Sequence, residues 1–441
     1  MKNKRKMMPM IILSIAIVTV VFTYLNANNS YEEKIINKPN KITKGIALNL
    51  EQTEGAGDYK LVTQSSWPTE GYKFNTELSK CENDGELAWD DTKKIIVFSG
   101  NVSDKCYVYF DIWFPSIADY CTNGDNLASC VKTFGDQGSD ISNIYVHTST
   151  LANGAGDNSY RYAGPSEQVN NFICFGSTTS PCPENNLYRI VGVFGENYHG
   201  VSGKQLSKLI KYDYMTTDEL GTDGDYYGAY TDSNSTYKGN NYANIASYYW
   251  NYKATNSGTN IWSTSLLNKT NLNTNFINYL GTTWTNKIAV TTWKVGGNKY
   301  ANIINAIPSV AYQNEIVNPT PGSTSTTGET EYKAKIGLMY VSDYGFAASP
   351  SAWTLTMGSY NNTTATNNNW MYMGLNEWTI SRYASNSDYA FSVYGNDAYG
   401  GSVDRNGVYL GYVGRASFNL ESSITYKSGS GSMSNPITIN L

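Results

Sequence analysis

The chain has 441 residues, a net charge of −5 and an isoelectric point near 5.3, which allows two or three domains. Aromatic residues make up 14% of it and charged residues only 16%, against about 25% in typical proteins. The aromatic content excludes an intrinsically disordered chain, and the lack of a basic stripe argues against nucleic acid as a partner. The composition favours a β-rich extracellular protein, although an AT-rich genome would also enrich Tyr and Asn.

The first 25 residues predict a membrane anchor. A basic cluster at residues 2–6 precedes the uncharged segment Met7–Leu25, which as a helix would cover about 28 Å of bilayer. Basic residues before such a segment hold the N-terminus in the cytoplasm. A cleaved signal peptide is the alternative, but this segment is longer than a usual hydrophobic region and lacks a small-x-small cleavage site. We expect a single-pass cell-membrane protein with its C-terminal bulk extracellular, tethered by residues 26–50.

Residues 51–115 predict a small β-sandwich. Strand-like runs cover residues 59–63, 94–98 and 106–110, and turn residues such as Asn83-Asp84-Gly85 separate them. Short strands at this spacing are typical of sandwiches. Residues 116–170 then read as helix and linker, because a loose helical pattern is followed by Gly, Asn and Ser.

A new domain is expected from residue 171 onward. Residues 186–194 are mostly apolar and aromatic, which predicts a buried strand, and residues 208–213 are its expected hairpin partner. A short helix is expected at Ser263–Leu280, and further strands after residue 335.

The six cysteines predict three disulfides, because their number is even and the chain is expected to be exported. Six cysteines allow 15 connectivities. The spacing favours three local bridges, and the alternative is a set of reduced, buried thiols. The expected pairs are Cys81–Cys106, Cys121–Cys130 and Cys174–Cys182.

Several stretches resemble uncharacterised cell-surface proteins of low-GC gut bacteria. The resemblance covers most of residues 55–441. The stretches are Trp67–Tyr72, Trp89–Asp91, Asp104–Asp111, Leu187–Phe194, Lys335–Gly345 and Glu377–Arg382.

The C-terminal half is similar to a domain of unknown function with the C-type-lectin-like fold, which formylglycine-generating enzymes share. Family members often have Arg-Pro inside a last strand, where this chain has Arg415-Ala416. The resemblance implies a surface location and ligand binding. It carries over no catalytic residue, because formylglycine-type oxidation needs cysteines that this half lacks.

The resulting fold class is mostly β with some helix (α+β). The expected parts are a cytoplasmic tip and signal anchor (1–25), a tether (26–50), a small β-sandwich (51–115), a helix and linker (116–170) and a C-type-lectin-like domain (171–441).

Few motifs point to catalysis. His147 and His199 lie far apart in the sequence without a nucleophile motif, and no zinc-protease or Walker motif occurs. Paired carboxylates of a glycosidase remain an alternative, with Asp343, Glu377 and Asp388 as candidates. No cofactor is expected.

One acidic segment resembles the start of a calcium loop. Asp223 and Asp225 occupy the first and third positions, but Asn234 stands where a bidentate Glu belongs. Calcium is therefore a weak alternative here, and an acidic surface turn is favoured.

The aromatic segment near residues 370–399 is the candidate binding face. Rigid Tyr and Trp beside adaptable Asn and Ser suit binding surfaces, and flat rings beside amides suit sugars. The alternative is that Trp370 and Trp378 belong to the core. The candidate ligand-binding residues are Trp378, Arg382, Tyr383, Asn386, Asp388, Tyr389, Tyr394, Asn396, Asp397, Tyr399 and Arg415.

The sequence thus predicts a membrane-tethered surface protein that binds a glycan or a host or community surface protein. Two alternatives stay open: a hydrolase acting on envelope glycans, and a structural surface-layer component.

Overall fold

The computed structural model describes residues 45–441 with internal gaps, which are 54–55, 63–66, 69–70, 91, 102–103, 232–236, 238–244, 253–257, 322–327, 362–367 and 396–398. The expected anchor and residues 26–44 of the expected tether lie outside the described residues, whereas residues 45–50, also expected to be tether, belong to the first strand of unit 1. Within the described part, no helix is both long and apolar enough to cross a membrane. The chain separates into unit 1, which ends at Phe114, and unit 2, Pro115–Leu441.

Unit 1 is built on the central strand β7, which pairs in parallel with β1 and antiparallel with β3 and β4. Cys106, Val108 and Phe110 of β7 are buried while the residues between them are more exposed, as expected for a strand with one covered face. Hairpin β5–β6 packs on this face, where Trp89 meets Phe110 at 5.1 Å between ring centroids. The strands are β1 (Gly45–Glu51), β2 (Tyr59–Val62), β3 (Tyr72–Phe74), β4 (Lys80–Cys81), β5 (Glu86–Asp90), β6 (Ile95–Ser99) and β7 (Lys105–Ile112).

Unit 2 is organised around a seven-stranded sheet in the order β18-β22-β12-β11-β9-β8, with β10 also paired to β11. Every residue of β11 is buried, as its mostly apolar sequence predicts for a strand covered on both faces. Strands β11 and β12 pair antiparallel, as the sequence predicts. The strands are β8 (Ile144–Val146), β9 (Tyr160–Tyr162), β10 (Phe172–Cys174), β11 (Leu187–Phe194), β12 (Leu206–Lys211), β18 (Ile336–Gly337) and β22 (Ser417–Asn419).

The segment 116–170 belongs to this unit. Its strands β8 and β9 extend the sheet beyond β11, and helix α1 packs against the same strands. The structure therefore places the start of unit 2 at Pro115, whereas the sequence suggested a new domain from residue 171. The turn-rich stretch expected to be a linker carries backbone hydrogen bonds, for example from the Asn158 amide to the His147 carbonyl at 2.9 Å.

Smaller sheets surround the central one. A four-stranded sheet has the order β16-β19-β20-β21, and two-stranded sheets pair β13 with β14, β15 with β17 and β23 with β24. Their bounds are β13 (Tyr226–Ala229), β14 (Ala246–Tyr248), β15 (Thr291–Lys294), β16 (Gly297–Asn298), β17 (Glu331–Ala334), β19 (Glu377–Tyr383), β20 (Tyr389–Val393), β21 (Val403–Gly407), β23 (Tyr426–Ser428) and β24 (Thr438–Ile439).

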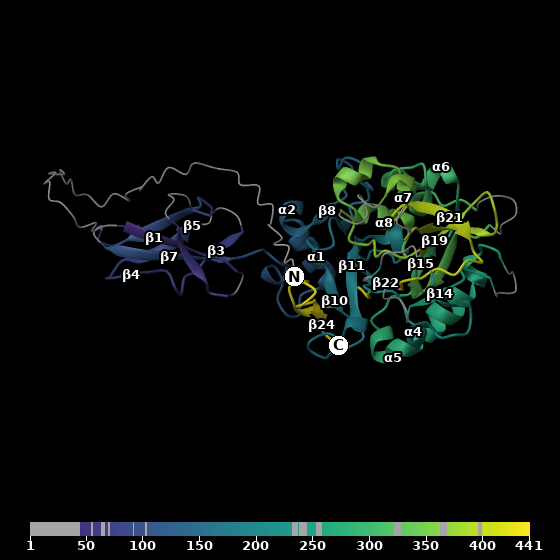
Figure 1. The fold of residues 1–441 in the computed structure, drawn as a ribbon, viewed down its shortest axis with the longest axis horizontal. Helices are drawn as coiled ribbons and strands as arrows, with labels where there is room; N and C mark the ends of the chain where they lie inside the picture. The colour runs from purple at the N-terminus through teal and green to yellow at the C-terminus, as the bar shows by residue number, and fades with distance from the viewer. Residues whose placement is uncertain are drawn as a thin grey trace, which may run out of the picture. The chain divides into compact units, whose positions relative to one another are not determined.

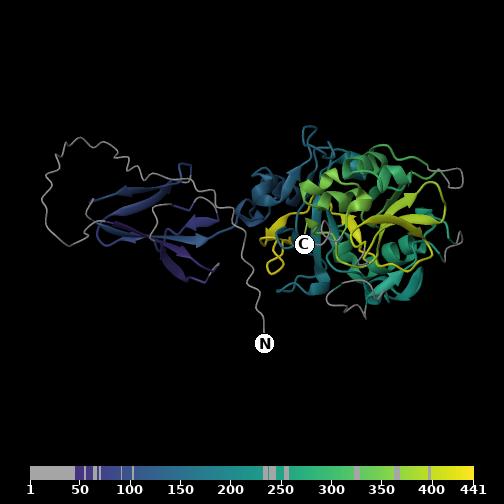
Figure 2. The same ribbon diagram turned by 45° about the horizontal axis from the view of Figure 1, so that its top comes forward.

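Helices cover opposite sides of unit 2. Figure 1 places α6 and α7 on one side and α4 and α5 on the other, and Figure 2 shows the same separation from a second direction. The helix expected over Ser263–Leu280 is present as consecutive helical turns that run into α5. The α- and π-helical segments are α1 (Leu127–Gly135), α2 (Ser139–Ser142), α3 (Glu196–His199), α4 (Thr217–Leu220), η4 (Leu267–Phe276), α5 (Ile277–Thr285), α6 (Tyr300–Ile303), α7 (Pro308–Tyr312), η5 (Gln313–Val317) and α8 (Val341–Ala347). The short 3-10 turns are η1 (Ile117–Asp119), η2 (Glu184–Asn186), η3 (Trp262–Thr264), η6 (Pro350–Thr354) and η7 (Met357–Ser359).

All three expected disulfides are present. Cys81–Cys106 joins β4 to β7 in unit 1, whereas Cys121–Cys130 and Cys174–Cys182 close short loops in unit 2. The strand-rich content with some helix also confirms the α+β class.

Candidate functional site

The strands β19, β20 and β21 carry a tyrosine-lined end of the four-stranded sheet. Arg382 of β19 pairs with Ala390 of β20, so the next pair outward is Tyr383 and Tyr389, at the mouth of the hairpin. Their ring centroids lie 6.5 Å apart in an edge-to-face arrangement. Both rings are partly exposed, which leaves apolar surface available beside a polar loop.

A pocket of about 380 Å³ opens at this end of the sheet. Its size fits the lower range of small-molecule sites. Two aromatic rings, one amide, one hydroxyl, one carboxylate and one guanidinium surround it. The lining residues are Tyr383, Ser385, Asn386, Tyr389, Asp404 and Arg405.

Arg405 is the cation of this pocket. Its guanidinium lies over the rings of Tyr300 at 4.5 Å and Tyr383 at 5.1 Å, which holds the side chain in place by cation–π attraction. Asp404 approaches it at 3.7 Å between Oδ1 and Nη1, beyond hydrogen-bond distance. The Asp404 carboxylate instead accepts the backbone N–H of Arg405 at 2.7 Å.

Asn260 holds the loop between β19 and β20 by hydrogen bonds. Its side-chain amide is fully buried and donates to the carbonyls of Tyr383, Asn386 and Tyr389 at 2.8, 3.0 and 2.6 Å. Its backbone N–H donates to the Ser387 carbonyl. One side chain therefore fixes both ends and the middle of the loop that lines the pocket.

The expected binding residues divide into four groups, of which three are described first. Tyr383, Asn386 and Tyr389 line the pocket, and Asp388 lies in the same loop. Tyr394 is half-buried and its ring meets that of Tyr399, whose side chain is 64% exposed, at 6.4 Å. Asn396 and Asp397 lie outside the described residues.

Three expected binding residues are buried in the interior. Trp378 donates from Nε1 to the Tyr248 carbonyl at 2.8 Å, and Arg382 donates to backbone carbonyls including that of Val295. Arg415 forms a two-pronged ion pair with Glu377 at 2.8 and 2.9 Å. Because these groups are buried with partners inside the protein, we leave all three out of the proposed site.

Sequence reasoning missed Arg405, Asp404 and the clamp Asn260. The first two depend on the register of β20 and β21, which sets Phe391 opposite Arg405. A hairpin centred on Gly400-Gly401 would instead set Phe391 opposite Leu410, so the glycine pair in the sequence does not give this register. No local pattern marks Asn260, since its partners lie more than 120 residues away along the chain.

A larger hollow of about 560 Å³ lies elsewhere in unit 2, lined by residues 176–178 and 280–284 and by Leu441. Among the described residues that line it, no side chain is ionisable and the one aromatic is Trp284. It offers fewer groups that could orient a ligand than the tyrosine pocket does.

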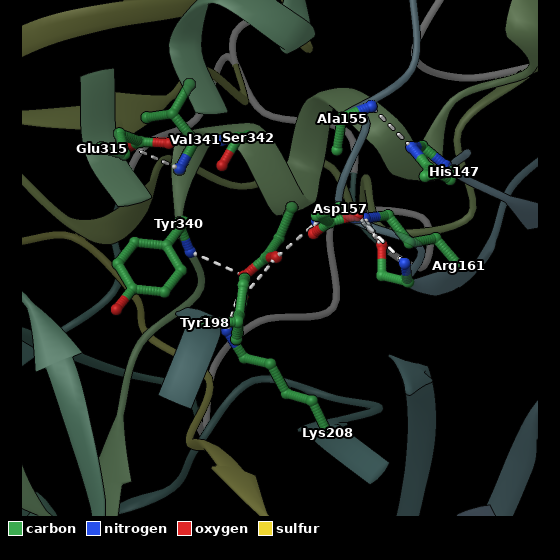
Figure 3. Close-up of polar contacts among 12 residues, drawn as sticks. His147, Ala155, Asp157, Arg161, Tyr198, Lys208, Glu315, Tyr340, Val341 and Ser342 are labelled. Atoms are coloured by element: carbon green, nitrogen blue, oxygen red, sulfur yellow. Dashed lines mark hydrogen bonds and ion pairs between the residues drawn. The ribbon is translucent and has the colours of Figure 1, made fainter. Parts of the chain in front are cut away.

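A buried ionic network crosses the interior of unit 2 (Figure 3). Lys208 donates to Asp343 Oδ2 and to the Tyr198 hydroxyl, both at 2.6 Å, while Tyr198 donates to Asp343 Oδ1. Arg161 pairs with Asp157 at 2.8 Å and lies 3.8 Å from Asp343. Each charge thus faces an opposite one, as burial requires.

The network also caps helix α8. Asp343 accepts the backbone N–H of Tyr340 at 3.1 Å, and Glu315 accepts those of Val341 and Ser342 at 3.2 and 2.9 Å (Figure 3). Negative groups at a helix N-terminus compensate its free N–H groups and dipole. Burial raises the pKa of Glu315, although hydrogen bonds from Ser381 and Ser342 oppose the shift.

Neither histidine is placed for catalysis at the surface. His147 is buried beside Phe346 and Trp353, and its Nδ1 accepts the Ala155 N–H at 3.0 Å (Figure 3). Burial lowers the pKa of His147, so the ring is neutral at pH 7. His199 Nδ1 accepts the Val201 N–H at 3.1 Å, so this side chain is bonded to the turn that directly follows it.

Two of the three candidate hydrolase acids form ion pairs with buried cations. Asp343 is paired with Lys208, and Glu377 with Arg415. Both side chains are at most 3% exposed. They therefore stabilise the interior, and only Asp388 lies in a loop that borders a pocket.

The acidic turn at Asp223 and Asp225 has a structural role. Asp225 is fully buried and its carboxylate accepts the backbone N–H groups of Tyr252, Leu266 and Leu267. Asp223 is exposed and accepts a hydrogen bond from Asn275 at 2.7 Å. Among the described residues, the group of acidic, Cys or His side chains close enough to share an ion is Cys81, Asp104 and Cys106, and its two sulfurs form a disulfide.

Comparison of the chain with family models, with curated proteins and with solved structures gave no match. The interpretation of the site therefore depends on its geometry alone.

Proposed function

We propose that unit 2 binds a glycan through the pocket between Tyr383, Tyr389 and Arg405. The observation that carries this proposal is the grouping of partly exposed tyrosine rings with amide, hydroxyl, carboxylate and guanidinium groups around one hollow. Sugar rings present apolar C–H faces and many hydroxyls, so they need both kinds of surface.

The loop geometry supports the same function. Asn260 fixes the loop backbone at three carbonyls, so the pocket is largely formed before a ligand arrives. A preformed site avoids the entropy cost of ordering the loop on binding. A structural surface-layer component would not need such a hollow.

We further propose that the protein works at the cell surface, anchored by residues 7–25, and that unit 2 is C-type-lectin-like. The three disulfides support an extracellular location, because such bonds persist in oxidising compartments. The mass of the mature N-terminus tests the anchor, since loss of residues 1–27 would contradict it.

A glycan and mucin array with the full chain in detergent tests the binding function. We expect binding above background for the wild type and at least about tenfold weaker binding for Tyr389→Ala, since the ring supplies contact area in the pocket. Asn386→Ala should weaken binding less, because one exposed amide contributes less than a ring.

Tyr279→Ala is the matched control. Tyr279 is an exposed tyrosine on α5, which contributes no lining residue to this pocket. The proposal fails if the folded wild type binds no glycan, or if Tyr279→Ala and Tyr389→Ala weaken binding equally.

A further inference from the structure

We infer that the tyrosine pocket selects sugars that carry a carboxylate, with Arg405 as the group that receives it. This inference rests on the proposed glycan-binding function and names the ligand class. It follows from three features: the N–H groups of the Arg405 guanidinium, the contacts of Asp404, and the two tyrosine rings close to the guanidinium.

The guanidinium of Arg405 has free hydrogen-bonding capacity. It makes no hydrogen bond to any of the described residues, and its side chain is 36% exposed. The buried arginines of unit 2 use their N–H groups fully or in part, as Arg415 does with Glu377 and Arg382 with backbone carbonyls. Arg405 therefore differs from them in presenting donors to the solvent of a pocket.

Two tyrosine rings hold the guanidinium in place. The ring centres of Tyr300 and Tyr383 both lie within about 5 Å of the guanidinium carbon, so cation–π attraction restricts the side chain. The paired N–H groups of a guanidinium match the two oxygens of a carboxylate. Because the Arg405 side chain is ordered before binding, less entropy is lost when a ligand binds, which favours affinity.

Asp404 at first sight opposes an anionic ligand. Its Oδ1 is occupied by the Arg405 backbone N–H, and its carboxylate also bonds the Tyr394 hydroxyl. Its remaining acceptor capacity suits the hydroxyl donors of a sugar. A uronic or sialic acid carries both features, because ring hydroxyls can donate to Asp404 while the carboxylate accepts from Arg405.

The net charge of the molecule does not explain such a preference. The chain carries −5 at pH 7, so its overall field repels anions. Selection for an acidic sugar would have to come from a local contact, and Arg405 is the lining residue that provides a positive charge.

The test compares a galacturonic acid tetramer with its methyl ester, which keeps every ring and ring hydroxyl and replaces each charged carboxylate with a neutral ester. We expect the full chain to bind the acid at least about tenfold more tightly than the ester at 0.15 M salt, by calorimetry. Sialyllactose against lactose, measured in the same way, distinguishes an animal-type acidic sugar from a plant-type one.

Three variants assign the effect. Arg405→Gln should reduce the acid-to-ester ratio to about one, and Arg405→Lys should restore it only in part, because lysine keeps the charge without the paired donors. Lys299→Gln removes an exposed charge next to Tyr300 that does not line the pocket, and should leave the ratio unchanged. Circular dichroism and melting temperature verify the fold of each.

The possible outcomes are separable. Equal binding of each acid and its neutral partner would overturn this inference while leaving glycan binding intact. A ratio that persists in Arg405→Gln, or is lost in Lys299→Gln, would also overturn it. No binding of any sugar by the folded wild type would overturn both this inference and the proposed function.

Discussion

Asp157 carries a charge inside unit 2 that its neighbours stabilise. Burial alone would raise its pKa, but the Arg161 charge and two hydrogen bonds from Ser159 outweigh burial and lower the pKa to about 2. A pKa below that of the unfolded chain stabilises the fold above about pH 4, and this contribution is lost as the pH falls towards 2. Asp157→Asn should therefore lower the free energy of unfolding by about 2 kcal/mol at pH 7, with the difference from wild type shrinking below pH 4.

Urea unfolding of both chains at pH 7, 4 and 2.5 measures this difference. Asp140→Asn is the control, since Asp140 is an exposed aspartate on α2 and should give wild-type values throughout. A difference for Asp157→Asn that stays constant across this pH range would show that the charge contributes nothing.

At the scale of elements, periodicity predicted strands better than it predicted helices. Strand β11 and its partner β12 were evident because burial on both faces leaves a mostly apolar sequence in β11. Helix α8 was not expected, because all seven of its residues are buried and its sequence therefore shows no polar face. Strands β8 and β9 are three residues each, too short for a pattern, and only tertiary pairing creates them.

Part of the candidate site was predictable from the sequence. Tyr383, Asn386 and Tyr389 are close in sequence, so composition alone indicated a binding segment. Trp378 and Arg382 are buried with most of β19, and this burial depends on how the strand packs, which composition does not report. Asn260 reaches this loop only through the fold.

The order of the loop between β19 and β20 should depend on Asn260. Asn260→Ala leaves three carbonyls without their buried donor, so we expect faster hydrogen exchange for amides of residues 384–389 and a loss of about 1–3 kcal/mol in stability. Asn260→Asp should be worse, because it sets a carboxylate against these oxygens.

Hydrogen-exchange mass spectrometry of the full chain measures this loop directly. Asn305→Ala, at an exposed asparagine of unit 2, should leave the exchange of 384–389 at the wild-type rate. Unchanged exchange in Asn260→Ala would contradict the clamp.

At the scale of the whole molecule, the two units have separate cores and separate disulfides. The buried core of unit 1 consists of Leu48, Phe74, Val108 and Phe110, whereas the core of unit 2 draws on residues from Ile117 to Ile439. A small core supplies little stabilisation beyond chain entropy, so a covalent link contributes a larger share of the total. We therefore expect unit 1 to depend on its disulfide more than unit 2 depends on either of its own.

The paired replacement Cys81→Ser with Cys106→Ser tests this dependence. The bridge spans 25 residues of sequence, and its loss should lower the free energy of unfolding of unit 1 by about 3 kcal/mol. In a domain of this size, that change moves the melting midpoint down by more than about 10 °C. Calorimetry of the full chain should show the unit 1 transition shifting while the unit 2 transition stays in place. Replacing Cys174 and Cys182 should shift the unit 2 transition and leave the unit 1 transition in place. This shift should be smaller, because the larger core of unit 2 unfolds with a larger entropy change. A single transition that both replacements shift equally would mean that the units unfold together.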